Sequence, residues 1–504
     1  MVPAMTLPTS LASTIGELRA GGWESVSVSA ELRRNAVARI RVGEPLFADV
    51  IGYDDTVLPQ LENALLAGHD VIFLGERGQA KTRLIRGLTE LLDEWMPIVA
   101  GSEINDDPYT PVSRHARKLV AAEGDDTPLD WVHRSDRYGE KLATPDTSIA
   151  DLIGEVDPIK VAEGRYLSDE LTIHYGLVPR SNRGLFAINE LPDLAERIQV
   201  GLLNVLEERD VQIRGHRVRL PLDVALFASA NPEDYTNRGR IITPLKDRFG
   251  SQIRTHYPLD ADVEMDIVIQ EATIPTVDGV ELVVPDFMTR LVATIAQEAR
   301  RSPHLNQRSG VSVRMSLACQ EALAASAVRR AVRAGESVAA PRVSDLEALP
   351  AAMAGKVEVD SLDEDRDGEI LMRIVQAAVL SVFRDLVPGN LHRGVVEAFN
   401  AHDGVATGDD LGAGAYAEVL DEIPALATAA TVVLGDEPES GCLVEPALLA
   451  SALELVLEGL HLSKRLNKQT FGPHSRYSSR GAESRAQGPG GPSGPSGPAA
   501  ATGK

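Results

Sequence analysis

Residues 71–82 have the residue types and the spacing of a loop that binds phosphate groups. The first four are apolar, as expected of a buried strand in a parallel sheet. Gly75 and Gly78 let the main chain turn so that its N–H groups face an anion. Lys81 can then reach the β and γ phosphates of a nucleotide, and the Thr82 hydroxyl can bind Mg²⁺. We therefore predict that ATP and Mg²⁺ bind here, and the predicted cofactor-binding residues are Gly75, Glu76, Arg77, Gly78, Gln79, Ala80, Lys81 and Thr82.

The residues that flank this loop agree with the prediction, with one exception. Leu84, Ile85 and Leu88 recur at helical spacing, so the phosphates would lie at the N-terminus of a helix. Ala80 stands where the common form of the loop has glycine directly before the lysine. We expect its methyl group to be tolerated, provided that the residue keeps a negative φ. The alternative interpretation is an ordinary strand, turn and helix with a lysine on the surface.

Polar residues follow two further apolar runs, 185–188 and 224–230, which we predict to be buried strands. Hydrolysis of ATP needs a group that orients the metal and a group that polarises water. Glu190 follows the first strand, where a general base would stand. Asn231 follows the second and could hydrogen-bond the attacking water or the γ-phosphate. Asn189 stands where aspartate is usual, and it offers a carbonyl acceptor without charge. A turn that ends a strand is the alternative interpretation of these residues. The predicted metal-binding residues are Thr82, Asn189 and Glu190.

Two arginines later in the chain are candidates for sensing the γ-phosphate. Arg248 lies in the segment 245–250, and it could reach from one subunit into the site of the next as an arginine finger. The alternative is a helix-end arginine paired with Asp247. Arg314 opens a predicted helix, from which an arginine could contact phosphate as part of a lid. The predicted catalytic residues are therefore Glu190, Asn231, Arg248 and Arg314.

Composition excludes several classes of protein. The formal net charge of −24 argues against a non-specific grip on nucleic acid across the surface. No apolar run approaches the ~20 residues that a membrane-spanning helix needs, so we expect no membrane insertion. The first eleven residues lack the basic and apolar regions of a secretory signal. Cys319 and Cys442 are expected to be reduced core thiols, which favours a cytoplasmic protein.

The pattern of strands and helices predicts an α/β protein with additional helical parts. Apolar runs that suit a parallel sheet stop near residue 260, after which helical patterns dominate. Residues 211–220 alternate like a hairpin, and the proline- and glycine-rich end cannot bury apolar surface. The predicted parts are an N-terminal helical segment (1–45), a nucleotide-binding core (46–260) with an insertion at about 100–183, a helical lid (261–360), a C-terminal helical region (361–466) and a disordered tail (467–504).

The candidate site residues, in their order and spacing, resemble an AAA+ ATPase of the branch that holds MoxR-type ATPases and the magnesium chelatase I subunit. Segments 182–194, 229–234 and 245–250 are similar to the chelatase patterns, and 51–70 resembles the lead-in to the phosphate loop. The resemblance covers about residues 46–355. It implies an αβα core with a parallel sheet followed by an all-helical lid, and it implies that Ile51 and Gly52 flank adenine.

The same resemblance implies a hexameric or heptameric homo-oligomeric ring with ATP between neighbouring subunits, and a partner protein with a von Willebrand A domain. Such a motor would use ATP hydrolysis to remodel a partner or to assist metal insertion. A second hypothesis comes from Asn189: a nucleotide-dependent scaffold that assembles on ATP with little or no turnover.

Overall fold

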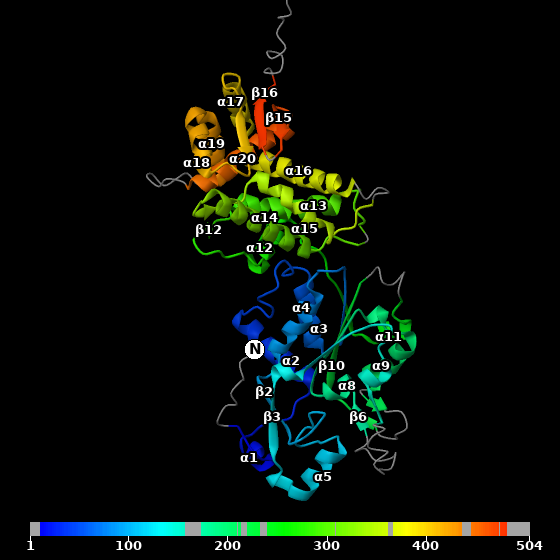
Figure 1. Ribbon diagram of the computed structural model, residues 1–504. Coiled ribbons are helices and arrows are strands. Elements are labelled where there is room, and N and C mark those ends of the chain that lie inside the picture. The colour runs from blue at the N-terminus through cyan, green and yellow to red at the C-terminus, as the bar shows by residue number, and fades with distance from the viewer. Residues whose placement is uncertain are drawn as a thin grey trace, which may run out of the picture. The chain divides into compact units, whose positions relative to one another are not determined.

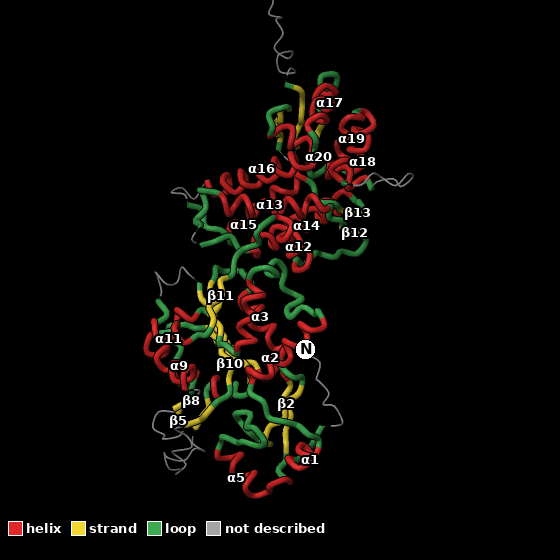
Figure 2. Tube along the Cα trace, turned by 180° about the vertical axis from the view of Figure 1, so that it is seen from behind, coloured by secondary structure: helices red, strands yellow, loops and turns green. Residues whose placement is uncertain are grey.

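The computed structural model describes two compact units (Figures 1 and 2). The first comprises residues 1–259 with 308–312, and the second comprises 260–307 with 313–504. Within them, the structure describes residues 11–156, 173–208, 210–212, 219–231, 239–307, 309–360, 366–435, 445–472 and 474–480. Cys442 and the glycine- and proline-rich end therefore lie outside the described residues.

A five-stranded parallel sheet forms the centre of the first unit. Its strand order is β11 (Ser251–Arg254), β1 (Val71–Leu74), β10 (Val224–Ala230), β7 (Gly184–Asn189) and β4 (Tyr138–Leu142). The register places Leu74 opposite Ala230, and Ala228 opposite Ile188. Because parallel strands end at the same edge, the polar residues that follow β1, β7 and β10 meet there.

Helices cover both faces of this sheet (Figure 1). Val71, Phe73 and Phe227 pack with residues of α2 (Val28–Val42), α3 (Val57–Ala67) and α4 (Lys81–Gly87). Ile72 and Ile188 point to the opposite face, where α9 (Glu196–Glu208) and α11 (Thr243–Arg248) pack. The alternation follows from the two-residue period of a strand. The predicted α/β architecture with a parallel sheet is confirmed.

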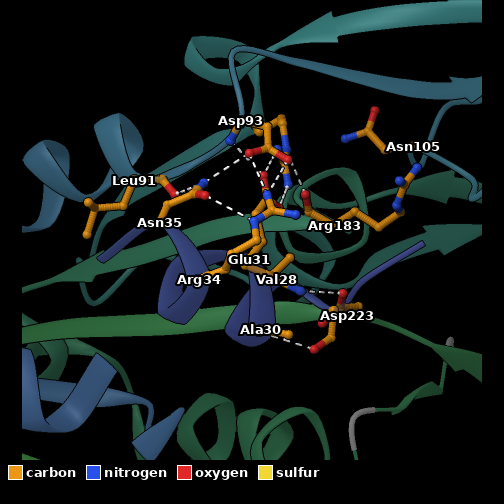
Figure 3. A network of polar contacts seen from close by, with 12 residues as sticks. Val28, Ala30, Glu31, Arg34, Asn35, Leu91, Asp93, Asn105, Arg183 and Asp223 are labelled. Atoms are coloured by element: carbon orange, nitrogen blue, oxygen red, sulfur yellow. Dashed lines mark hydrogen bonds and ion pairs between the residues drawn. The ribbon is translucent and has the colours of Figure 1, made fainter. Parts of the chain in front are cut away.

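A buried ion pair joins α2 to the chain just before β4. Arg137 Nη1 and Nη2 lie 2.7 and 2.6 Å from the two carboxylate oxygens of Glu31, and the side chains are 1% and 5% exposed. Glu31 also accepts the main-chain N–H of Asp93 at 2.7 Å, while Arg137 Nε donates to the carbonyl of Arg183 at 2.9 Å (Figure 3). The network therefore ties the N-terminal helical part to the core. Val28 N also donates to Asp223 Oδ2 at 2.8 Å.

The prediction that residues 100–183 form an insertion is wrong for Tyr138–Leu142. These residues form β4, which is an edge strand of the central sheet. The strand is only half buried and carries no apolar run, so its sequence gave no strand signal. Other parts of the first unit form small separate pairs. β2 (Trp95–Val99) pairs with β3 (Leu129–His133), and β5 (Gly154–Val156) pairs with β6 (Ile173–Tyr175). The short helices α1 (Ile15–Ala20), α5 (Arg114–Glu123), α6 (Ile149–Leu152) and α8 (Leu177–Arg180) accompany them.

The expected hairpin near residues 211–220 is present, as β8 (Asp210–Gln212) pairs antiparallel with β9 (Arg219–Pro221). The second unit begins with the helices α12 (Ala261–Glu271), α13 (Asp286–Arg301), α14 (Val313–Ala334) and α15 (Leu349–Ala354). Two-residue strands, β12 (Glu281–Leu282) and β13 (Val338–Ala339), lie among them. Further helices follow: α16 (Asp367–Leu386), α17 (Gly389–Phe399), α18 (Ala413–Glu422), α19 (Pro424–Leu434) and α20 (Pro446–Leu462).

Two predictions about the end of the chain need correction. The helical region 361–466 also contains a strand, β14 (Val405–Gly408). The disordered tail does not begin at residue 467, because β15 (Leu466–Phe471) and β16 (His474–Ser479) complete a three-stranded sheet with β14. Tyr477 of β16 is buried, and its hydroxyl donates a hydrogen bond to Glu458 of α20. This polar strand therefore has a contact with the core that composition did not reveal. Among the described residues, none of the helices combines the length and hydropathy of a membrane span.

Candidate nucleotide site

The loop between β1 and α4 is shaped by two glycines at positions where a side chain would collide. A Cβ atom on Gly75 would lie 1.9 Å from Thr255 Oγ1 and 2.2 Å from Gln79 Oε1. Gly78 has a φ of +75°, and a Cβ there would lie 2.4 Å from Ser312 Cβ. Both positions therefore require glycine, which agrees with a tight main-chain turn around an anion.

Ala80 does not keep a negative φ, and this expectation is wrong. The residue precedes α4 with φ 53° and ψ 13°, which is the left-handed region. The loop must reverse direction here before the helix can begin, so the position suits the glycine found in the common form. A left-handed alanine costs about 1–2 kcal/mol relative to its right-handed conformation. The chain thus stores backbone strain in the predicted phosphate loop.

Lys81 lies across the loop rather than on the surface. The side chain is 7% exposed, and its Nζ donates to Glu76 O at 2.7 Å and Asn231 Oδ1 at 2.8 Å, as well as to Gly75 O. The alternative of a surface lysine is therefore wrong. An ammonium group held at the N-terminus of a helix, beside main-chain turns, is suited to bind phosphate oxygens in place of these carbonyls.

Asn231 connects this lysine to Glu190. Its Nδ2 donates to Glu190 Oε2 at 2.8 Å, while its Oδ1 accepts from Lys81. Glu190 has φ 54° and ψ 49°, so a second left-handed residue lies in the same cluster. This conformation turns the chain sharply at the end of β7 and leaves the carboxylate beside Asn231. Three residues predicted from separate motifs thus form one hydrogen-bonded chain.

Asn189 has both ends of its amide engaged. Its Oδ1 accepts from Ser229 Oγ at 3.1 Å, and its Nδ2 donates to Glu140 Oε1 at 2.5 Å. Ser229 Oγ also accepts from Glu190 N at 3.3 Å. The other carboxylate oxygen of Glu140 accepts from Arg86 Nε at 2.9 Å, and from the hydroxyl of Tyr138 at 3.1 Å. The hydrogen bond with Glu140, and then its charge, raises the pKa of Arg86.

A second group of residues supports the loop from the side of β11. The hydroxyl of Tyr53 lies 2.9 Å from Gln79 O and 2.8 Å from His256 O, and its single proton is shared between these two carbonyls. Thr255 Oγ1 donates to Gln79 Oε1 at 2.7 Å, and Gln79 Oε1 also accepts from Glu76 N at 3.0 Å. Ile51 and Gly52 directly precede Tyr53, which places this segment next to the loop. Their contact with adenine stays a prediction.

The residues present fit a nucleotide with Mg²⁺. Magnesium sites of this kind use one or two protein oxygen atoms together with phosphate oxygens and water. Thr82 lies in the first turn of α4, and Asn189 and Glu190 lie at the edge of the sheet from which α4 begins. The described residues contain no cluster of three or more His, Cys, Asp or Glu that would hold a metal alone. A metal here would therefore depend on phosphate as a ligand.

The structure does not bring Arg248 into this set, and Arg314 belongs to the other unit. Arg248 lies at the end of α11, where its Nη1 donates to Pro244 O at 2.9 Å. Arg314 is exposed near the start of α14, in the second unit. Their roles as an arginine finger and as a lid sensor stay predictions.

Several residues of the site were not predicted from the sequence. Tyr53 and Thr255 come from positions distant in the sequence and carry no motif. Ser229 precedes Asn231 on a predicted strand, so its place at the strand end could have been noticed. Glu140 was missed because β4 has no apolar pattern, and Arg86 because it resembles an ordinary exposed helix residue.

Comparison with known proteins finds distant relatives that are subunits of magnesium chelatase. The magnesium-chelatase subunit ChlI of Nostoc sp. (strain PCC 7120) is 26% identical over 288 residues, which cover 55% of this chain and 71% of that protein. The chloroplastic ChlI-1 of Arabidopsis thaliana is 28% identical over 242 residues, covering 45% of this chain and 51% of the relative. The chain thus spans only about half the length of the plant protein.

No family model matches the chain. A solved assembly of subunits BchI and BchD of magnesium chelatase matches 62% of this chain and 96% of that one, at 20% identity and a TM-score of 0.33. The curated relatives confirm the similarity to magnesium chelatase subunit I that the site residues suggested.

Proposed function

We propose that this protein is an ATP-binding and ATP-hydrolysing AAA+ motor similar to magnesium chelatase subunit I and MoxR. The observation that supports this most is the hydrogen-bonded chain from Lys81 through Asn231 to Glu190. It places a phosphate-binding cation, an amide and a carboxylate at one edge of a parallel sheet, where nucleotides bind in α/β folds.

The residues have distinct roles in this proposal. Lys81 and the main-chain N–H groups of the loop bind the β and γ phosphates. Glu190 accepts the proton of the attacking water, and Asn231 holds that water or the γ-phosphate in place. Thr82 and Asn189 would hold Mg²⁺, which would neutralise charge that develops on the phosphates. Arg248 of a neighbouring subunit would add positive charge, and Arg314 would report on the phosphate from the lid.

The motor would act as a homo-oligomeric ring in the cytoplasm. Each site would span two subunits, so hydrolysis in one site would change the contact with the next. The ring would remodel a partner protein or assist metal insertion, and its partner would carry a von Willebrand A domain. The curated relatives are magnesium-chelatase subunits, which supports the part of this proposal that concerns metal insertion.

A second candidate is a scaffold that assembles on ATP with little or no turnover. The observation that favours it is Asn189, which has no charge and whose amide is engaged by Ser229 and Glu140.

Steady-state release of inorganic phosphate distinguishes the two candidates, with Lys81→Ala and Glu190→Gln as comparisons. For a motor, Lys81→Ala loses nucleotide affinity, while Glu190→Gln binds ATP and hydrolyses it at least about a hundredfold more slowly. For a scaffold, the wild type releases phosphate no faster than either variant, yet ATP still changes its oligomeric state. If wild type and Lys81→Ala bind ATP equally, both candidates are wrong.

A further inference from the structure

The amide of Asn189 has a defined orientation because its two neighbours differ in chemistry. An ionised carboxylate only accepts hydrogen bonds, so Glu140 must face the NH₂ group of Asn189, at 2.5 Å. The amide oxygen then faces Ser229, whose hydroxyl donates to it at 3.1 Å. One hydrogen bond leaves the second lone pair of this oxygen available. Glu140 therefore determines which atom of Asn189 is presented at the edge of the sheet.

Glu140 is itself held by the helix that begins with the phosphate-binding lysine. Arg86, on α4, lies 2.9 Å from Glu140 Oε2 through both Nε and Nη2. The Tyr138 hydroxyl donates to the same oxygen at 3.1 Å. The carboxylate thus links α4 to the end of β7. Register supports this link, since Leu142 of β4 lies opposite Asn189.

The same contact explains why asparagine replaces the usual aspartate. A carboxylate at position 189 would lie 2.5 Å from Glu140, in place of the amide nitrogen. Two ionised carboxylates at that distance repel each other strongly. With asparagine, the pair carries one negative charge, on Glu140, and that charge is paired with Arg86.

We propose that Glu140 is a positioning residue for Mg²⁺-dependent ATP hydrolysis, carrying on β4 the negative charge that is usual at position 189. Its hydrogen bond to the amide nitrogen orients the amide oxygen of Asn189 toward the position expected for the hydrated metal. The negative charge of Glu140 lies beside that position. This inference rests on the proposed ATPase function. It deepens that function by assigning a role to Glu140, which no sequence motif marks and which lies on a half-exposed edge strand.

A charge-swap cycle tests the proposal with Glu140→Gln, Asn189→Asp and the double variant. The first readout is the affinity of each full-length protein for a non-hydrolysable fluorescent ATP analogue as Mg²⁺ is titrated. The second is phosphate release. The Mg²⁺ requirement of Glu140→Gln is expected to rise on the order of tenfold, as for other residues that orient a metal ligand. Asn189→Asp alone is expected to lower phosphate release, because two carboxylates then share one position.

The double variant restores a single negative charge, now on position 189. Its Mg²⁺ requirement and phosphate release are expected to return to within about threefold of wild type, which additive effects would not produce. Glu90→Gln is the matched control. Glu90 pairs with Arg134 at 2.5 Å on the surface, so its loss removes the same charge away from the site. This variant should match wild type in both readouts.

Three results would overturn the proposal: faster phosphate release by Asn189→Asp, a double variant no better than the product of the single variants, or an unchanged Mg²⁺ requirement in Glu140→Gln. Lys81→Ala separates this failure from that of the proposed function. If Lys81→Ala loses nucleotide binding while the cycle shows no coupling, only the role of Glu140 is wrong. If Lys81→Ala binds nucleotide normally, the ATPase proposal fails as well.

Discussion

Glu31 and Arg137 are 106 positions apart in the sequence, yet they form a bidentate ion pair inside the first unit. The guanidinium nitrogens of Arg137 lie 2.7 and 2.6 Å from the two carboxylate oxygens of Glu31. Each partner has further hydrogen bonds, to Asp93 N and to Arg183 O. A buried charge that loses its partner keeps the cost of desolvation without the compensating attraction. The pair is therefore the most sensitive electrostatic contact described between α2 and the core.

Replacement of one partner should destabilise the first unit strongly. We expect Glu31→Gln or Arg137→Met to lower its free energy of unfolding by about 3–5 kcal/mol. All three tryptophans, Trp23, Trp95 and Trp131, lie in this unit, so tryptophan fluorescence during chemical denaturation reports on it selectively. The matched control is Arg34→Gln. Arg34 pairs with Asp93 at 2.6 Å but is half exposed, and its loss should cost less than about 1 kcal/mol. Equal effects at the two sites would contradict this account.

Tyr53→Phe should weaken the support of the phosphate loop. The variant removes the one hydroxyl proton that the carbonyls of Gln79 and His256 share, and such a loss costs about 1 kcal/mol. We expect lower stability of the first unit and weaker binding of nucleotide. Tyr109→Phe is the control, since Tyr109 donates to Trp23 O at 3.2 Å away from the loop, and its loss should leave nucleotide affinity unchanged.

The same tyrosine predicts a pH dependence. Burial raises the pKa of Tyr53 to about 12, from an ordinary value of 10.0. The folded state therefore retains the proton more tightly than the unfolded state. This contribution to stability is complete below pH 10.0 and is lost as the pH rises through about 12. The difference between wild type and Tyr53→Phe in free energy of unfolding should shrink over that interval. A difference that stays constant up to the higher pH would show that Tyr53 titrates normally.

Ala80→Gly should stabilise the first unit. Alanine is strained at φ 53°, whereas glycine adopts this conformation readily, so we expect a gain of up to about 1 kcal/mol after the entropy cost of glycine. Nucleotide binding should be kept. Ala121→Gly is the opposite control, because Ala121 is exposed in the right-handed helix α5, and glycine there should cost up to about 1 kcal/mol. Chemical denaturation followed by tryptophan fluorescence measures the free energy of unfolding of both variants. A loss of stability in Ala80→Gly would contradict the inference that Ala80 is strained.

Mixing variants tests whether Arg248 acts between subunits. Arg248→Ala should bind ATP but release phosphate at least about a thousandfold more slowly. Addition of Glu190→Gln subunits, which carry an intact Arg248, should restore part of the phosphate release. A mixture of Lys81→Ala and Glu190→Gln is the control, since every site then keeps a damaged residue and no recovery is expected. If Arg248→Ala alone hydrolyses ATP at the wild-type rate, the arginine has no role as a finger.

The parts of the site that sequence predicted are those encoded by neighbouring residues. The order of an apolar run, Gly75, Gly78 and Lys81 specifies strand, turn and helix locally, and the structure has that order. Asn231 and Glu190 could be placed near Lys81 because parallel strands end at one edge.

The parts that were missed depend on contacts between distant segments. Glu140 contacts Asn189 on the neighbouring strand β7, and nothing near residue 140 indicates that β4 joins the central sheet. The conformation of Ala80 was predicted wrongly because a negative φ is usual for alanine, whereas the turn of this loop requires a positive φ. Strands β15 and β16 were missed because their polar residues follow a helix and precede a segment of low complexity.

The hydrogen bonds of Lys81 have a consequence for how ligand enters and leaves. Its ammonium group donates to three oxygen acceptors within the protein, so a phosphate that binds here must displace these contacts. When phosphate binds, Lys81 exchanges one set of oxygen partners for another. The net free energy gained on binding is therefore smaller than the attraction between the two charges alone. Under the proposed function, the same protein oxygens can receive the ammonium group of Lys81 again when the nucleotide leaves.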